Sequence, residues 1–439
     1  MKVFNIIIYY IIFFILNESN QTHIVFNFTK STKESQNYPD NLIQNDLEIT
    51  LEIGTPPQKI NLNLRSEIYH FSVTSSEVNL PYPTFNETNS MSLIKIKNKT
   101  VNWKEEFEEG YPIYESLIIN KREIKNVSLV LATSISSNQT GVLGLRPLKS
   151  YHPSGYLSFI YQIKRLANLD NYAFTLRYDS DNKGELIIGS YPHLYDKKYD
   201  ENNFYYTKIG NIGENVEWVF DFDTIKYNNK SVPIPLLVQK CLVKIDFGLI
   251  LVPYILKQYL RRQFFGQYCI EKDDKKRNIT IFHCAKNMNF TNFKNLSFVL
   301  KDIDYEFVLT YKDIFIEKDD EYISLLAFDS NYKPSHTPIW IFGETFLKKY
   351  QLVFDLDRKI MGLYKENNND NNNNNSSKND IHENKKNYLN GYNIIYIVLI
   401  IILSLIVIAL VVYIIYYIKK PRKYRPFELD DNFDYIPSK

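Results

Sequence analysis

Short segments in which apolar and polar residues alternate dominate the middle of the chain. Leu47–Ile53 and 60–64 alternate strictly and flank the Gly-Thr-Pro-Pro turn at 54–57, as expected of half-buried strands joined by a tight connection. The same pattern predicts further strands at 116–120, 185–188, 217–221, 298–300 and 351–355. Helical spacing of apolar residues occurs at 156–169 and 253–264. Many short strands with few helices indicate an all-β domain.

Two apolar runs lie near the ends of the chain. The first, at 6–16, follows Lys2 and ends in a polar stretch, which predicts a secretory signal peptide at 1–19. The second, at 394–418, is uncharged and precedes five basic residues. Because positive charge beside a span stays cytosolic, we expect a single-pass type I membrane protein with a transmembrane helix at 394–418 and a cytosolic tail at 419–439. A retained anchor and a buried core helix are the respective alternatives.

The composition of the chain between these two apolar runs delimits the folded region and excludes some classes of function. The segment 366–391 consists almost entirely of Asn, Asp, Lys and Ser, which predicts a disordered stalk and leaves 45–365 as the folded ectodomain. The net charge of +2 and the lack of a basic face argue against a nucleic-acid binder. The seven histidines are scattered without metal-ligand spacing, so we expect no metal and no cofactor.

Cysteines and glycosylation motifs fit a secreted domain. Cys269 and Cys284 enclose a short segment and could form a disulfide, worth about 3 kcal/mol in the chain-entropy model, whereas Cys241 is expected to be a free, buried thiol. Asn-X-Ser/Thr motifs predict a glycoprotein. They occur at Asn27, Asn86, Asn98, Asn126, Asn138, Asn229, Asn278, Asn289 and Asn295.

The two halves of the folded region repeat one plan. The segment 62–67 resembles 243–248 in placement, and each is followed by an apolar pair and a glycine, at 142–144 and 341–343. This echo suggests two lobes.

An ordered set of motifs resembles the pepsin-like aspartic proteases (peptidase A1). The matching segments are the strand and turn at 53–59, Gly-Val-Leu-Gly-Leu at 141–145, the Gly-Glu-Leu segment at 182–189, and 339–350 with 353–355. The resemblance spans 47–364. It implies a bilobal all-β fold, with lobes at 45–205 and 206–365 and a deep cleft that takes an extended peptide or protein. It also implies the Cys269–Cys284 disulfide in the second lobe.

Members of that family hydrolyse peptides with two aspartates, one from each lobe, which share a proton and activate a water. This chain has Asp246-Phe247-Gly248 at the second position but Arg65-Ser66-Glu67 at the first, with no gap after the turn at 54–59. A guanidinium is always charged, so Arg65 beside Asp246 would hold that carboxylate ionised and unable to donate a proton. We therefore expect two-aspartate hydrolysis to be lost.

Further departures from the family pattern agree. Phe247, Leu249 and Ile250 replace hydroxyl positions of the second turn, and Trp103 takes the place of the flap tyrosine, with 104–106 at the flap tip. Glu67 is the one nearby carboxylate that could substitute, but an ion-pairing loop residue is the simpler interpretation.

Three functions follow from this sequence. The first is a membrane-anchored aspartic-protease-like protein that is catalytically impaired and binds peptides in its cleft. The second is an active aspartic endopeptidase that uses Asp246 in acidic vesicles or at the cell surface. The third is a structural surface glycoprotein. We expect the secretory pathway to deliver the protein to the plasma membrane or to endosomal or lysosomal vesicles, because a tyrosine-based sorting motif lies at 424–427.

Overall fold

The computed structural model describes residues 23–31, 40–96, 100–103, 107–135, 139–147, 158–212, 215–232, 239–266, 268–290, 293–330 and 339–365. The predicted signal peptide (1–19), stalk (366–391), transmembrane helix (394–418), tail (419–439) and flap tip (104–106) lie outside these residues. Among the helices of the described residues, none is long and apolar enough to cross a membrane.

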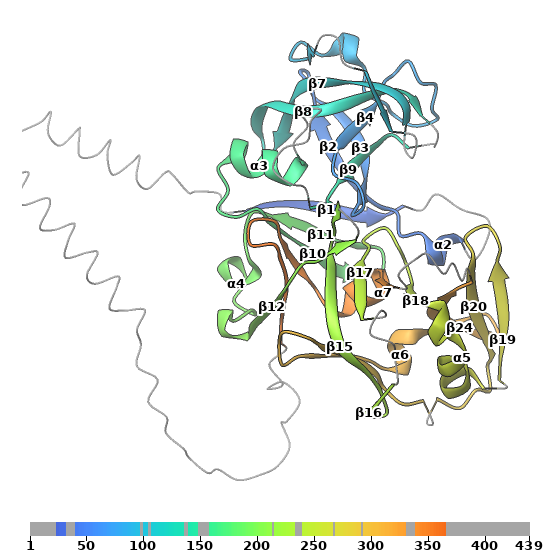
Figure 1. Ribbon diagram of the computed structural model, residues 1–439. Coiled ribbons are helices and arrows are strands. Elements are labelled where there is room, and N and C mark those ends of the chain that lie inside the picture. The colour runs from blue at the N-terminus through green and yellow to red at the C-terminus, as the bar shows by residue number, and fades with distance from the viewer. Residues whose placement is uncertain are drawn as a thin grey trace, which may run out of the picture. The chain divides into compact units, whose positions relative to one another are not determined.

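Nearly all of the described strands belong to two large sheets (Figure 1). The first sheet contains β1 (Ile24–Lys30), β2 (Leu47–Ile53), β3 (Gln58–Arg65), β4 (Phe71–Thr74), β5 (Ile94–Lys95), β6 (Val101–Trp103), β7 (Phe107–Ile119), β8 (Arg122–Ile135), β9 (Gly141–Gly144), β10 (Ala173–Ser180), β11 (Lys183–Ile188), β12 (Phe204–Lys208), β26 (Val353–Asp355) and β27 (Ile360–Tyr364). The second contains β15 (Val219–Tyr227), β16 (Lys230–Ser231), β17 (Lys240–Val243), β18 (Ile250–Val252), β19 (Cys269–Asp274), β20 (Ile279–Ala285), β21 (Leu296–Leu300), β22 (Glu306–Leu309), β23 (Phe315–Lys318), β24 (Glu321–Asp329) and β25 (Trp340–Phe342). A small hairpin joins β13 (Asn211–Ile212) to β14 (Asn215–Val216).

The helices are short. They are α2 (Asp40–Ile43), α3 (Phe159–Ala167), α4 (Pro192–Tyr195), α5 (Lys257–Leu260), α6 (Tyr311–Ile314) and α7 (Glu344–Lys349), with single turns η1 (Glu87–Asn89), η2 (Glu201–Asn203), η4 (Tyr254–Leu256) and η5 (Arg261–Phe265). The prediction of a mostly β domain is confirmed, and both predicted helical segments contain helix. The predicted helix at 253–264 is divided into η4, α5 and η5.

Two features extend the fold beyond the predicted boundaries. Strand β1 lies before residue 45 and inserts between β2 and β11 in the first sheet. Strands β26 and β27, from the end of the folded region, also join the first sheet through β10 and β12. The first sheet therefore draws strands from both sides of the predicted division at 205.

The internal echo in the sequence corresponds to a repeated strand arrangement. In the first sheet, β3 lies parallel to β9, β9 antiparallel to β4, and β4 parallel to β8. In the second sheet, β17, β25, β18 and β24 follow the same order of parallel and antiparallel pairs. Figure 1 shows the first set in the upper part of the molecule and the second set in the lower part. A candidate site residue lies at the end of the first strand of one set, Arg65 of β3, and three residues beyond the end of the first strand of the other, Asp246 after β17.

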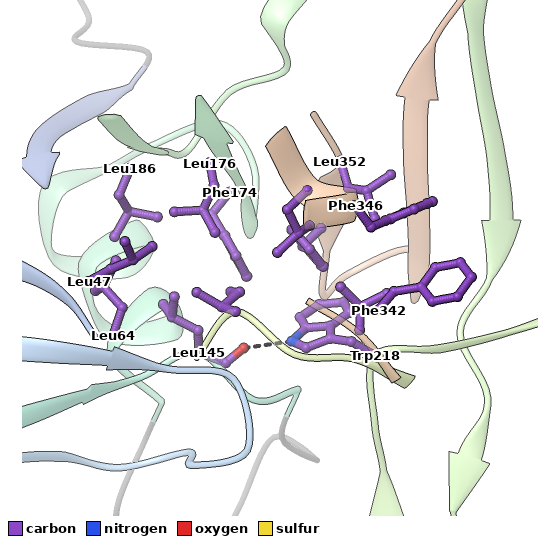
Figure 2. Packing of buried hydrophobic residues seen from close by; sticks show 14 of the residues in the cluster. Leu47, Leu64, Leu145, Phe174, Leu176, Leu186, Trp218, Phe342, Phe346 and Leu352 are labelled. Atoms are coloured by element: carbon purple, nitrogen blue, oxygen red, sulfur yellow. Dashed lines mark hydrogen bonds between the residues drawn. The ribbon is translucent and has the colours of Figure 1, made fainter. Parts of the chain in front are cut away.

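A shared apolar core joins the two sheets near these strand ends. Trp218, which precedes β15, is fully buried, and its ring packs edge-on against Phe174 of β10 and Phe354 of β26. Its indole Nε1 donates a hydrogen bond of 2.8 Å to the carbonyl oxygen of Leu145, which directly follows β9 of the first sheet (Figure 2). This packing holds the turns that follow β3 and β17 next to each other.

Candidate functional site

Two turns form the candidate site, one after β3 and one after β17. Arg65 is the last residue of β3 and pairs with Gly144 of β9. Asp246 lies three residues beyond the end of β17, in the turn that leads to β18. Backbone fills the space beside this second turn, because a Cβ added at Gly248 would lie 1.9 Å from the carbonyl oxygen of Leu42. A glycine is therefore required there.

The structure brings Arg65 and Asp246 together. Arg65 Nη1 lies 3.6 Å from Asp246 Oδ2, and Arg65 Nη2 lies 2.9 Å from Asp46 Oδ1. The side chains of Arg65 and Asp246 are 13% and 8% exposed, whereas that of Asp46 is 35% exposed. The guanidinium is thus placed between one buried and one half-exposed carboxylate.

Asp46 is a site residue that the sequence analysis missed. In the β2–β3 ladder, Glu48 pairs with Asn63, and continuing this antiparallel register by two residues places Asp46 opposite Arg65. Directly opposed, oppositely charged residues on neighbouring strands stabilise a sheet. The turn at 54–57 fixes the register of this hairpin, and that register predicts the pairing of Asp46 with Arg65.

Ser66 links the two turns through hydrogen bonds. Its Oγ donates to Asp246 Oδ1 at 3.0 Å and accepts from the backbone N–H of Ile245 at 3.0 Å. A serine hydroxyl has one proton to donate, so Oδ1 of Asp246 acts as an acceptor here. Both carboxylate oxygens of Asp246 therefore face positive or donating groups.

The second turn makes no matching hydroxyl contact, because apolar residues fill those positions. Phe247 packs with Leu42, and Leu249 packs with Ile43 in a small apolar cluster. The link between the turns is consequently one-sided: it runs from Ser66 of the first turn to the second.

Two more ion pairs flank these turns. Glu67 pairs with Lys244, and Arg146 pairs with Glu217. Burial raises the pKa of Glu217, against the opposing charges of Arg146 and Lys244. Burial would lower the pKa of Lys244, but the neighbouring carboxylates, Glu67 foremost, raise it above its ordinary value. The interpretation of Glu67 as an ion-pairing loop residue is confirmed, and its partner is Lys244.

The family model for eukaryotic aspartyl proteases matches residues 48–365. The chain belongs to this family. The resemblance inferred from the motifs is thereby confirmed. A curated relative, plasmepsin VI of Plasmodium berghei (strain Anka), is 25% identical over 364 aligned residues, which cover 73% of this chain and 74% of the relative.

The remaining predicted site residues lie away from these ion pairs in the sequence. Cys269 and Cys284 are paired neighbours on β19 and β20 and form a disulfide. Cys241 is a free, buried cysteine, as expected, and burial raises its pKa. Trp103 ends β6, where it pairs with Phe107 of β7.

A cavity of about 510 Å³ lies beside the polar face of β2 and β3. Its lining comprises Thr29, Lys30, Ser31, Glu48, Lys59, Asn61, Tyr82, Pro83, Thr140, Asn182 and Lys183. In the part of the chain that the structure describes, no three His, Cys, Asp or Glu side chains are grouped as metal ligands.

Proposed function

We propose that this family member has lost two-carboxylate hydrolysis and instead binds extended peptides in its cleft. The observation that carries the proposal is the Arg65 guanidinium beside Asp246, at the position where the family supplies its first aspartate. The two-aspartate mechanism needs one protonated and one ionised carboxyl group. A guanidinium cannot take either role, because it neither accepts a hydrogen bond nor loses its proton in proteins.

Among the residues that the structure describes, the neighbouring carboxylates Asp46 and Glu67 are both engaged in ion pairs. Asp46 is engaged by the opposite side of the Arg65 guanidinium, and Glu67 is paired with Lys244. Asp246 Oδ1 accepts a hydrogen bond from Ser66 Oγ, and Asp246 Oδ2 faces the Arg65 guanidinium. Both carboxylate oxygens are thus engaged by groups other than a scissile carbonyl.

Peptide binding survives this loss in principle. Members of the family take peptide substrates in a cleft, and an extended peptide is held mainly by backbone hydrogen bonds, which do not require the catalytic aspartates. The apolar run at 394–418 and the signal at 1–19 support placement of this protein as a glycosylated type I membrane protein of the cell surface or of endosomal vesicles.

Peptidase activity tests the first part of the proposal. The purified full chain is incubated with a mixed peptide library at acid pH, with and without a pepstatin-type inhibitor, beside the Asp246→Asn variant. We expect no pepstatin-sensitive cleavage by either protein. Pepstatin-sensitive turnover that disappears in Asp246→Asn would overturn the proposal and establish the alternative, an active endopeptidase that uses Asp246.

Peptide affinity tests the second part. Peptides selected on the full chain are measured against Trp103→Ala, at the predicted flap, and against Tyr268→Ala, an exposed residue before β19 that serves as a control. Cleft binding predicts at least tenfold weaker affinity for the first variant alone. Unchanged affinity for Trp103→Ala would contradict cleft binding and favour the structural surface glycoprotein.

A further inference from the structure

Near Asp246, charged side chains of the first sheet form ion pairs with charged side chains of the second sheet. The turns of the first sheet contribute Arg65, Glu67 and Arg146, and those of the second contribute Glu217, Lys244 and Asp246. Every one of these six residues has its named ion-pair partner across the boundary. Three ion pairs thus join the lobes: Arg65 with Asp246, Glu67 with Lys244, and Arg146 with Glu217.

The three pairs form one connected group. Lys244 interacts electrostatically with Asp246 and Glu217 as well as with Glu67. Arg146 Nη1 also lies 3.5 Å from the carbonyl oxygen of Glu67, to which it donates a hydrogen bond. A change in the separation of the lobes would therefore strain several of these contacts together.

Partial burial gives these pairs more weight than surface ion pairs. Except for Glu67, each of the six side chains is at most one-quarter exposed. Pairs of this kind are less screened by solvent than exposed pairs, and removing one partner leaves a partly buried charge without compensation. Separating the lobes would break these weakly screened attractions.

Uncharged contacts cross the same boundary. Asn45 is fully buried, and its Nδ2 donates to the carbonyl oxygen of Ile245 at 2.8 Å. The Trp218 indole donates to the carbonyl oxygen of Leu145 from the opposite direction. Backbone and side chains thus hold both lobes at one fixed distance around the ion pairs.

We propose that this group of ion pairs is an interlobe clamp, which locks the two lobes at a single separation. Ligand sites between two lobes ordinarily open and close by hinge motion, and the clamp would suppress that motion here. It is independent of the proposed loss of hydrolysis and of peptide binding, because it concerns contacts between the lobes alone.

A charge-swap series on the full chain tests the clamp. Arg146→Glu and Glu217→Arg each place like charges together, and the double variant restores an opposite pair. Hydrogen exchange of the backbone amides at 65–68 and 244–248 reports local opening of the two turns. We expect each single variant to speed exchange about tenfold in both turns. In the double variant, exchange should fall most of the way back to the wild-type rate.

A matched ion pair within one lobe is the control. Lys226 of β15 and Glu306 of β22 are 2.9 Å apart and about twice as exposed as Arg146 and Glu217, but both belong to the second sheet. Lys226→Glu should leave exchange at 65–68 unchanged. Wild-type exchange in the Arg146 and Glu217 single variants, or a double variant as disturbed as the singles, would overturn the clamp.

A milder variant covers the case in which charge reversal prevents folding. Glu67→Gln keeps the side-chain shape and removes the partner of Lys244. We expect exchange in both turns to rise about threefold, a smaller effect because Glu67 is the most exposed member of the clamp. No rise in either turn would contradict the proposal.

Discussion

Replacement of Arg65 by alanine measures how strongly Asp246 depends on its guanidinium. Asp246 is 8% exposed and would keep the hydrogen bonds from Ser66 and the electrostatic interaction with Lys244. Asp46 is 35% exposed and can regain water. Breaking a buried ion pair from one side costs about 3–5 kcal/mol. Because the 3.6 Å contact is long and water reaches one side of the site, we expect about 2–4 kcal/mol of lost stability.

A double-mutant cycle separates the ion pair from other effects of truncation. Free energies of unfolding in urea are measured for wild type, Arg65→Ala, Asp246→Asn and the double variant. With Asp246 neutral, the arginine is no longer needed to compensate a buried charge. The double variant should therefore be more stable than the sum of the two single effects predicts, by about 1–2 kcal/mol.

Lys59 provides the control on the same strand. Lys59 lies on the same face of β3 as Arg65, because an even number of positions separates them. Its side chain is 75% exposed, and the carboxylate with which it pairs, on Glu52, is 4.0 Å away. Lys59→Ala should change stability by less than about 0.5 kcal/mol. Strictly additive costs in the cycle, or an Arg65→Ala variant as stable as Lys59→Ala, would refute the reasoning that Arg65 compensates the charge of Asp246.

Three further predictions concern the rest of the fold. Cys269→Ser should lower the free energy of unfolding by about 3 kcal/mol, because Cys269 and Cys284 close a loop with a sequence separation of 15; reduced wild type should match it, and a smaller loss than about 1 kcal/mol would count against the disulfide. Burial alone would raise the pKa of Asp274, but hydrogen bonds from Arg277 hold this pKa below its ordinary value. The ionised Asp274 therefore stabilises the fold at neutral pH, and this contribution is lost as the pH falls through the folded-state pKa. Asp274→Asn should accordingly cost about 1 kcal/mol at neutral pH and progressively less as the pH falls through the folded-state pKa, measured by urea unfolding at several pH values; a pH-independent cost would contradict this. Trp218→Phe should cost about 2–3 kcal/mol through the lost hydrogen bond and a small cavity, and a thermal melt unchanged from wild type would show that this indole does not join the lobes.

Local sequence patterns predicted what depends on neighbouring residues. Alternation located β2 and β3, and the unbroken count from the turn at 54–59 assigned Arg65 to the position of the family's first aspartate; in the structure Arg65 ends β3. Ordered motifs then predicted the family, which the family model confirms. These features could be predicted because side-chain direction along a strand follows a strict period of two.

Long-range pairing was harder to predict. Strand β1 alternates as clearly as β2, but its main partner β11 lies far along the chain, and no turn joins them. The ion pairs of Lys244 and Glu217 depend on how the two lobes meet, which no local pattern records. The pairing of Asp46 with Arg65 could have been predicted, because the hairpin register alone places these residues opposite each other.

The charges around Asp246 give this aspartate a structural role that does not depend on catalysis. An arginine buried at the end of β3 needs a carboxylate nearby, and Asp246 and Asp46 supply two. Removing Asp246 would leave Arg65 with only its more exposed partner. The retention of Asp246 is thus accounted for by compensation of charge, and its presence in this family position is not by itself an argument for catalysis. Only the combination of activity with sensitivity to Asp246→Asn would restore that argument.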